Sequence, residues 1–260
     1  MLEARNLSVN YDERVAVADV SLSARPGEVI AIIGPNGAGK STLLRALNGS
    51  VNAFQGSVLL DGAPLSGFAR RSLARRIAVV AQETNPLFPV TVLEFVLGGR
   101  YAWSNAWGWE NERDVEIARG VLLETELEDF EARLMNELSG GERQRAVVAR
   151  ALATEAKVFL LDEPTANLDL AHQATMFRLV RRRCDRDNAT AVVVTHDVNL
   201  AAEFADRVLL LKEGRAIASG GPNEVLTPLL LQDVFALEVL VDAHPISGAP
   251  RITPVHGRQG

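Results

Sequence analysis

Short apolar runs recur along the first eighty residues and are separated by polar turn residues. Five of these runs have the length and side-chain character of β-strands: residues 2–9, 15–22, 29–33, 57–60 and 77–80. Asp61-Gly62 follows the fourth run as a turn signal. The pattern therefore predicts a first part of the chain that is dominated by strands.

After residue 82 the apolar positions recur at helical spacing. We predict helices over residues 91–97, 110–123 and 126–134, with no strand before Lys157. The stretch of about residues 85–145 is therefore expected to be a helical insertion.

Strands return in the second half of the chain. We predict them over residues 158–161, 191–195 and 208–211, the last followed by a hairpin turn at residues 212–215. Strands that alternate with helices are typical of a parallel sheet covered by helices, so the predicted fold class is α/β. Residues 244–254 are rich in Pro and Gly and are expected to lie over the surface as a tail.

A glycine-rich loop joins the apolar run 29–33 to a helical pattern over residues 40–47. Residues 34–41 match G-x₄-G-K-[ST], whose glycines let backbone N–H groups turn inward around phosphates. Lys40 would reach the β- and γ-phosphates, and the Ser41 hydroxyl would help to hold Mg²⁺. The alternative is a simple glycine turn before a helix, but a chance match in this lysine-poor chain has odds of about 2 in 1000. The loop predicts a nucleoside triphosphate site.

Two carboxylates follow the apolar run 158–161. Asp162 and Glu163 emerge at the C-terminal end of that strand, where doubly wound sheets place their ligands. Asp162 is placed to bind the Mg²⁺ that bridges the phosphates, and Glu163 to orient or deprotonate an attacking water. Acidic turns after strands are common, and it is the phosphate loop earlier in the chain that favours the catalytic interpretation.

A second possible phosphate-binding helix end lies at Ser139-Gly140-Gly141. Serine is a good N-cap for the helix that continues to Leu152, so capping alone would explain it. A helix N-terminus is also an anion receptor. Two such ends, about 100 residues apart with a helical insertion between them, favour a role in binding phosphate.

The composition narrows the functional classes. The net charge is −6, which argues against a nucleic-acid partner because backbone phosphates need a basic face. The run Arg181-Arg182-Arg183 is interpreted as solvated cations at a helix C-terminus. No apolar run reaches 18 residues and the start lacks a signal-peptide core, so a cytosolic location is expected. The single cysteine, Cys184, excludes an internal disulfide and is expected to be unreactive.

In this order and spacing, the three motifs resemble the nucleotide-binding subunit of an ATP-binding-cassette (ABC) transporter. The resemblance implies a P-loop NTPase (RecA-like) parallel-sheet core with an N-terminal antiparallel β subdomain and an inserted α-helical subdomain. It implies an ATP-binding domain over residues 1–237, with the helical subdomain at about 85–145, and a C-terminal tail over residues 238–260.

The resemblance also assigns the ATP-binding residues one by one. Tyr11 matches the aromatic residue that stacks on adenine, and Asp169 lies in Ala166-Asn167-Leu168-Asp169, which matches a loop that crosses to the other protomer. The family often has Ser where Ala166 stands. The phosphate loop contributes the remaining contacts within one chain: Gly34, Pro35, Asn36, Gly37, Ala38, Gly39, Lys40, Ser41 and Thr42.

The same resemblance implies the catalytic and metal-binding residues. His196 matches the histidine that touches the γ-phosphate, and it would act with Glu163. Gln82 matches the glutamine that contacts Mg²⁺ and the attacking water and senses the membrane partner. The implied metal-binding residues are Ser41, Gln82 and Asp162.

The implied assembly is a head-to-tail homodimer that hydrolyses ATP to ADP and phosphate. Each ATP lies between the phosphate loop of one copy and Ser139-Gly140-Gly141 of the other. The implied partners are transmembrane permease subunits and, indirectly, a periplasmic or surface solute-binding protein. The expected location is the cytoplasmic face of the inner membrane, as a peripheral subunit.

Three short segments favour one group of importers. Residues 75–82, 91–101 and 244–252 resemble ATPases that serve iron-chelate (siderophore), haem and cobalamin uptake. The alternatives are a zinc, manganese or molybdate importer, a soluble ABC protein acting on DNA or ribosomes, and a nucleotide-binding regulator without hydrolysis. The presence of both Glu163 and His196 argues against the last of these.

All three tryptophans lie in one seven-residue stretch inside the helical insertion: Trp103, Trp107 and Trp109. In this family the insertion docks a short cytoplasmic helix of the permease, and aromatic residues anchor interfaces. The competing interpretation is a small aromatic core that closes the insertion.

Overall fold

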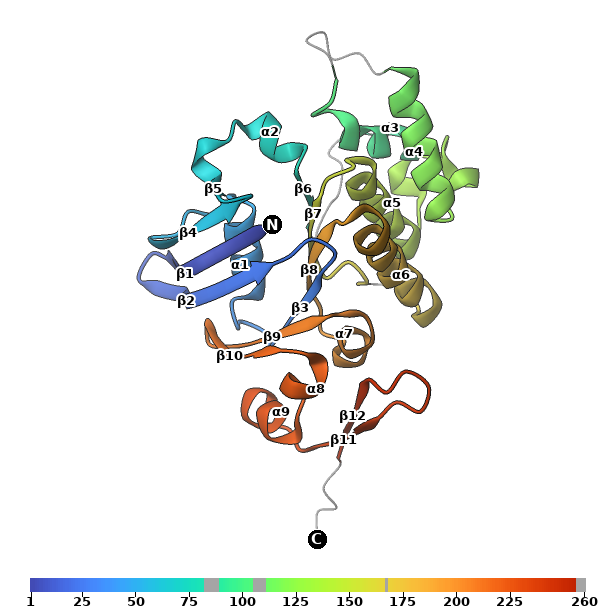
Figure 1. The fold of residues 1–260 in the computed structure, drawn as a ribbon. Helices are drawn as coiled ribbons and strands as arrows, with labels where there is room; N and C mark the ends of the chain where they lie inside the picture. Colours follow the sequence, from blue (N-terminus) through green and yellow to red (C-terminus); the bar gives the residue numbers. More distant parts are fainter. Residues whose placement is uncertain (82–88, 105–110, 167, 256–260) are drawn as a thin grey trace.

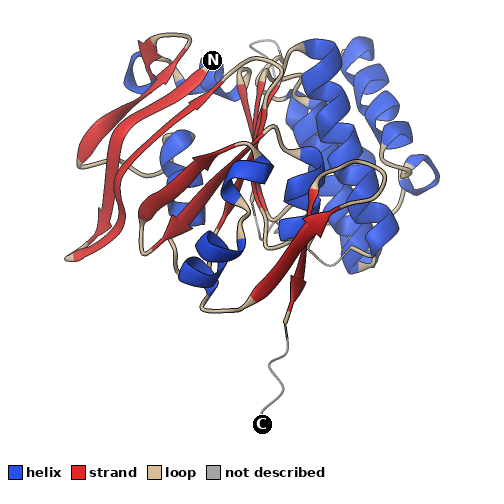
Figure 2. Cartoon of the chain, turned by 60° about the horizontal axis from the view of Figure 1, so that its bottom comes forward, coloured by secondary structure: helices blue, strands red, loops and turns tan. Residues whose placement is uncertain are grey.

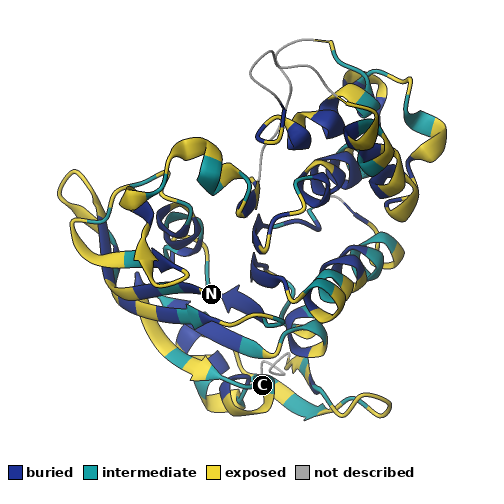
Figure 3. Cartoon of the chain, turned by 45° about the horizontal axis from the view of Figure 1, so that its top comes forward, coloured by how far each residue is buried: buried dark blue, intermediate teal, exposed yellow. Residues whose placement is uncertain are grey.

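The computed structural model describes residues 1–81, 89–104, 111–166 and 168–255 (Figure 1). Its centre is a six-stranded sheet with the order β10 (Arg215–Gly220), β9 (Arg207–Lys212), β3 (Val29–Ile33), β8 (Thr190–Val194), β7 (Val158–Asp162) and β6 (Ile77–Val80). The strands from β9 to β6 are parallel, whereas β10 is antiparallel to β9. Every residue of β3, β7 and β8 is buried (Figure 3), which explains their uninterrupted apolar sequences.

A second, antiparallel sheet forms the N-terminal part of the fold. Its order is β2 (Arg14–Ala24), β1 (Leu2–Tyr11), β4 (Gln55–Leu60) and β5 (Ala63–Pro64). Helix α1 (Lys40–Leu47) contacts β1 of this sheet and β7 of the central sheet, so one buried apolar cluster joins both sheets. The predicted N-terminal antiparallel β subdomain is confirmed.

Helices of the inserted segment pack together beside the central sheet (Figure 1). They are α3 (Val92–Leu97), α4 (Glu112–Glu124) and α5 (Gly140–Ala153). The buried Arg100 ties them together, because its Nε lies 2.8 Å from Asp114 Oδ1 and its Nη1 donates to the Ala153 carbonyl at 2.9 Å. The predicted helical insertion is therefore present.

Further helices cover the sheet or extend from its edges. They are α2 (Arg70–Ala74), α6 (Leu170–Asp187), α7 (Val198–Phe204), α8 (Pro222–Val225) and α9 (Pro228–Phe235). Short 3₁₀ turns occupy Leu65–Gly67, Gly98–Arg100, Glu128–Phe130 and Met135–Glu137. None of the helices in the described ranges has both the length and the apolar character that crossing a bilayer requires.

One predicted helix was wrong. Residues 126–134 hold only the 3₁₀ turn Glu128–Phe130, although their apolar spacing resembles a helix. Glu126 has a left-handed backbone (φ 57°) that ends α4, and Leu134 forms a β-bridge with Thr91. Local backbone geometry and a long-range pairing therefore override the periodic pattern.

The C-terminal residues form a hairpin where a surface tail was expected. β11 (Val239–Ala243) pairs with β12 (Pro250–Pro254), and the hairpin lies beside α7 (Figure 2). The Asn199 side chain accepts from the Ile252 N–H at 2.8 Å and donates to its carbonyl at 3.2 Å. The side-chain amide of Asn199 on α7 thus pairs with the backbone of β12 at Ile252. This hairpin was not apparent from the Pro- and Gly-rich sequence.

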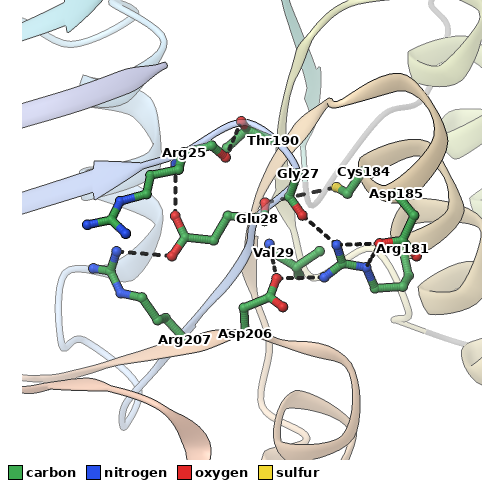
Figure 4. Close-up of polar contacts among 10 residues, drawn as sticks. All are labelled: Arg25, Gly27, Glu28, Val29, Arg181, Cys184, Asp185, Thr190, Asp206 and Arg207. Atoms are coloured by element: carbon green, nitrogen blue, oxygen red, sulfur yellow. Dashed lines mark hydrogen bonds and ion pairs between the residues drawn. The ribbon is translucent and has the colours of Figure 1, made fainter.

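A polar cluster fixes the end of β3 that lies opposite the glycine loop (Figure 4). Asp206 Oδ2 accepts from the Val29 N–H at 2.7 Å and from Arg181 at 2.6 Å. Arg181 and Arg183 are ion-paired, the latter to Glu124 at 2.9 Å, so these two cations of the arginine run are not simply solvated as expected.

Burial raises the pKa of Cys184 to about 12. Its thiol therefore stays protonated at neutral pH, in agreement with the expected lack of reactivity.

Candidate functional site

The glycine loop between β3 and α1 takes a shape that side chains would prevent. Gly39 has a left-handed backbone (φ 95°), and a Cβ there would lie 2.3 Å from the Ala16 carbonyl oxygen. A Cβ on Gly34 would lie 2.2 Å from the Leu211 carbonyl oxygen. Both glycines are therefore required by close backbone contacts with β2 and β9.

The loop borders a pocket of about 860 Å³. Residues from five separate parts of the chain line it: Tyr11, Arg14, Val15, Ala16, Asn36, Gly37, Ala38, Gly39, Lys40, Ser41, Thr42, Glu163, His196, Glu213 and Gly214. The fold thus brings the predicted phosphate loop, Tyr11, Glu163 and His196 to one cavity at the carboxyl ends of parallel strands.

Lys40 is held inside the loop. Its Nζ donates to the carbonyls of Gly34 at 2.8 Å and Pro35 at 3.0 Å, and the residue is only 6% exposed. Burial lowers the pKa of Lys40, while the negative charges of Glu163 and Asp162 oppose that shift. The ammonium group is therefore positioned before any phosphate arrives.

Ser41 lines the pocket and pairs with Asp162, which lies outside the pocket lining. Ser41 Oγ donates to Asp162 Oδ1 at 3.1 Å, which joins the start of α1 to the end of β7. Burial raises the pKa of Asp162, and the hydrogen bond from Ser41 partly counteracts this shift. A hydroxyl beside a buried carboxylate fits the all-oxygen coordination that Mg²⁺ prefers.

Glu163 and His196 form a close pair at the pocket. His196 Nε2 lies 2.5 Å from Glu163 Oε1. Glu163 has a left-handed backbone (φ 51°), and its N–H donates to the Val194 carbonyl at 3.0 Å. The turn after β7 therefore directs the carboxylate toward the residue that follows β8.

The predicted second anion receptor lies on the helical insertion and does not line this pocket. Ser139 Oγ accepts from the Glu142 N–H at 3.2 Å, and Glu142 accepts from the Ser139 N–H at 2.7 Å. That backbone hydrogen bond lowers the pKa of Glu142. Ser139, Gly140 and Gly141 thus begin a well-capped helix that belongs to a different surface.

Asp169 likewise lies outside the pocket lining. Its Oδ1 accepts from the His172 N–H at 2.9 Å and lies 2.7 Å from His172 Nδ1, so it caps α6. The backbone hydrogen bond lowers the pKa of Asp169. Gln82 and Asn167 lie outside the described residues.

Sequence reasoning missed several residues that line the pocket. Arg14, Val15 and Ala16 follow the β1–β2 turn, and Gly214 of the β9–β10 turn donates to the Ala38 carbonyl at 3.0 Å. Glu213 precedes that glycine in the same turn. The turn itself was predicted, but its position over the glycine loop depends on the pairing of β9 with β3.

Comparison with known proteins identifies relatives of the whole chain. The model of the ABC transporter family matches residues 17–166. A hemin import ATP-binding protein of Pseudomonas fluorescens is 44% identical over 97% of this chain and 99% of its own length. A petrobactin import ATP-binding protein of Bacillus anthracis is 35% identical, with 99% and 94% covered.

Two solved structures are similar across most of the chain. A metal-chelate type ABC transporter in an inward-facing conformation matches with a TM-score of 0.84, 30% identity and 98% of both chains covered. The dimeric bacterial ABC cassette MJ0796 matches with a TM-score of 0.77 and 31% identity over 85% of this chain and 98% of its own. The expected fold class is thereby confirmed.

Proposed function

Because the chain belongs to the ABC transporter family, as an ATPase of the import type, we propose that it powers the uptake of a metal chelate such as haem. The observation that carries this proposal is the convergence of Lys40, Ser41 and the Glu163–His196 pair on one pocket, with Asp162 hydrogen-bonded to Ser41 from outside the pocket lining. Under this proposal, residues 1–237 are the ATP-binding domain and residues 85–145 its helical subdomain.

The pocket geometry accounts for the binding of ATP. Lys40 supplies a positive charge to the β- and γ-phosphates, and the N-terminus of α1 adds backbone donors and its dipole. Tyr11 is 44% exposed beside the phosphate loop, which leaves a ring face available for adenine. Ser41 and Asp162 would hold Mg²⁺, which neutralises phosphate charge, and Gln82 would be the third metal-binding residue.

Glu163 and His196 account for hydrolysis. The Glu163 carboxylate would orient the attacking water and accept its proton, since it lines the same pocket as the phosphate loop. His196 lies within hydrogen-bond distance of Glu163 and would also contact the γ-phosphate. Catalysis then depends on positioning and on stabilising charge around a loose phosphoryl transition state.

The second half of each site would come from another copy of the chain. Ser139, Gly140 and Gly141 are absent from the pocket lining of their own chain but form a helix N-terminus suited to phosphate. In a head-to-tail dimer they would close over the partner's ATP, with Asp169 close to the same interface. ATP would then hold the two copies together, and hydrolysis would release them.

A groove beside the helical insertion suits the permease. It has a volume of about 550 Å³, and mostly apolar and small residues line it: Ala74, Ile77, Ala78, Val79, Ala81, Gly98, Gly99, Tyr101, Ala102, Val147, Arg150, Ala151 and Thr154. In the part of the chain that the structure describes, no carboxylate pairs with Arg150. We therefore propose as its occupant a short cytoplasmic permease helix with an apolar face and a carboxylate. This contact would keep the ATPase on the cytoplasmic face of the membrane.

Trp103 does not line the groove but contacts Thr154, which does. Its indole N–H donates to the Thr154 carbonyl at 2.9 Å, and the guanidinium groups of Arg75 and Arg100 lie 4.9 and 5.2 Å from its ring. These contacts favour packing within the insertion over direct docking. Trp107 and Trp109 lie outside the described residues.

Charge reversal at Arg150 is expected to detach the permease. Arg150→Glu would place a second carboxylate opposite the carboxylate of the permease helix. The two negative charges repel each other, so co-purification with the permease should fall by about tenfold or more. Trp103→Ala is the matched control, because it loses packing and should lower the melting temperature while co-purification persists. If Arg150→Glu still co-purifies at the wild-type level, the proposed docking groove is wrong.

Uptake in a deletion strain tests the proposed solute class. Cells lacking this chain are expected to lose uptake of labelled haem, with iron-siderophore and cobalamin complexes measured in parallel. The wild-type gene should restore uptake and a Lys40→Ala gene should not. Normal uptake of all three chelates, with a defect for zinc, manganese or molybdate, would contradict the proposal.

A further inference from the structure

The turn that carries Glu163 is held from two sides. On one side, the Glu163 N–H donates to Val194 of β8, and its carboxylate pairs with His196. Glu163 itself has a left-handed backbone conformation, which costs free energy for a residue other than glycine. The orientation of its carboxylate therefore depends on what holds the rest of the turn.

Gln144 of α5 holds the other side. Its Nε2 donates to the Pro164 carbonyl at 3.0 Å and approaches the Glu163 carbonyl at 3.5 Å. Among the described residues, no other donor reaches the Pro164 carbonyl, and both residues are buried. A buried amide that caps a buried carbonyl is costly to remove, so this link fixes the turn to α5.

The same helix begins at Ser139 and Gly140, only a little more than one turn before Gln144. A displacement of that helix end is therefore transmitted directly to the Gln144 amide. The residues that would engage the partner's nucleotide and the link to Glu163 thus lie on one rigid segment.

We propose that Gln144 is a positioning residue that makes the orientation of Glu163 depend on engagement of the partner's nucleotide by α5. This inference rests on the proposed head-to-tail dimer. Glu163 serves the nucleotide of its own phosphate loop, whereas Ser139 to Gly141 serve the nucleotide of the other copy. Gln144 therefore links the two sites of the dimer through one chain, and hydrolysis becomes cooperative in ATP.

Replacing the amide separates this role from simple packing. Gln144→Met keeps the side-chain length and loses the donor, so kcat should fall by about tenfold or more, as expected when a reacting group is misplaced. The affinity for ATP should stay within about twofold, because no phosphate contact is removed. The Hill coefficient for ATP should fall from above one toward one.

Gln173→Met is the matched control. Gln173 of α6 donates to the Leu168 carbonyl at 3.1 Å, so it also caps the loop after β7 but from a helix that does not carry Ser139. Its loss should lower the melting temperature to a similar extent while kcat and the Hill coefficient change by less than about twofold. Should Gln144→Met fail to fold, Gln144→Ala is measured in its place, because alanine favours the helix.

A mixed complex then locates the effect. In a transporter whose two copies carry different tags, one copy is given Glu163→Gln so that turnover depends on the other copy's glutamate. Gln144→Met should reduce turnover when it is placed in the copy with the intact Glu163, and should have no effect when it is placed in the copy that carries Glu163→Gln. If turnover falls instead when Gln144→Met is placed in the copy that carries Glu163→Gln, Gln144 acts through the contact of α5 with the partner's phosphate. This result would overturn the proposal.

Failure of this inference differs from failure of the proposed function. Unchanged kcat and Hill coefficient in Gln144→Met, with normal ATP-driven dimerisation, would contradict the role of Gln144. The proposed ATPase dimer would not be contradicted by that result. Wild-type protein that neither dimerises nor turns over ATP would contradict the proposed function itself.

Discussion

Glu163→Gln is expected to retain ATP binding, lose turnover and accumulate as a dimer on gel filtration. The change removes the group that accepts the proton of the attacking water, and general-base catalysis contributes about 10²- to 10⁴-fold to a rate. Phosphate release should therefore fall by that factor. ATP that is not hydrolysed keeps the two copies together, because each γ-phosphate would contact both chains.

The control for Glu163→Gln makes the same chemical change elsewhere. Glu116 is exposed on α4, so Glu116→Gln should keep the wild-type rate and remain monomeric after ATP is consumed. A Glu163→Gln protein that is monomeric and fully active would show that this carboxylate has another role.

Lys40→Ala is expected to weaken ATP binding itself. The ammonium group is the buried cation of the phosphate loop, and a charged hydrogen bond contributes about 1.5–3 kcal/mol. Calorimetry with MgATP should therefore give an affinity lower by roughly 10- to 100-fold, since 1.4 kcal/mol is a factor of ten.

Another lysine of the chain supplies the control for this experiment. Lys157 is exposed and donates to the Asp187 carbonyl, remote from the pocket lining. Lys157→Ala should bind ATP like the wild type. Equal ATP affinities for Lys40→Ala and the wild type, with unchanged melting temperatures, would show that Lys40 does not bind the phosphates.

Local sequence signals predicted the parts of the fold and site that depend on neighbouring residues. The phosphate loop is one example, because strand, glycines, lysine and helix follow one another directly from residue 29 to residue 47. The acidic turn at Asp162 and Glu163 is another, since the buried strand β7 determines where both carboxylates emerge.

Features that depend on long-range packing were not predictable in the same way. Arg14 and Glu213 reach the pocket because two distant turns lie over the glycine loop, and neither has a local motif. The C-terminal hairpin depends on Asn199, and the contact of Gln144 with Pro164 crosses from the helical insertion to the core. Such contacts arise from the arrangement of elements, not from their periodicity.

The proposed mechanism requires ATP sites that two copies of the chain share, and mixing two inactive variants tests this requirement most directly. Lys40→Ala disables the phosphate loop of one copy, and Gly141→Asp places a repelling carboxylate at the helix end of the other. Each variant alone should be inactive. An equal mixture should recover phosphate release clearly above that of either variant alone but below about a quarter of the wild-type rate, because half of the dimers are mixed, each holds one intact site, and the α5 of the copy that supplies Glu163 engages no nucleotide. A mixture that stays as inactive as its two components, although mixed dimers form, would contradict the shared sites.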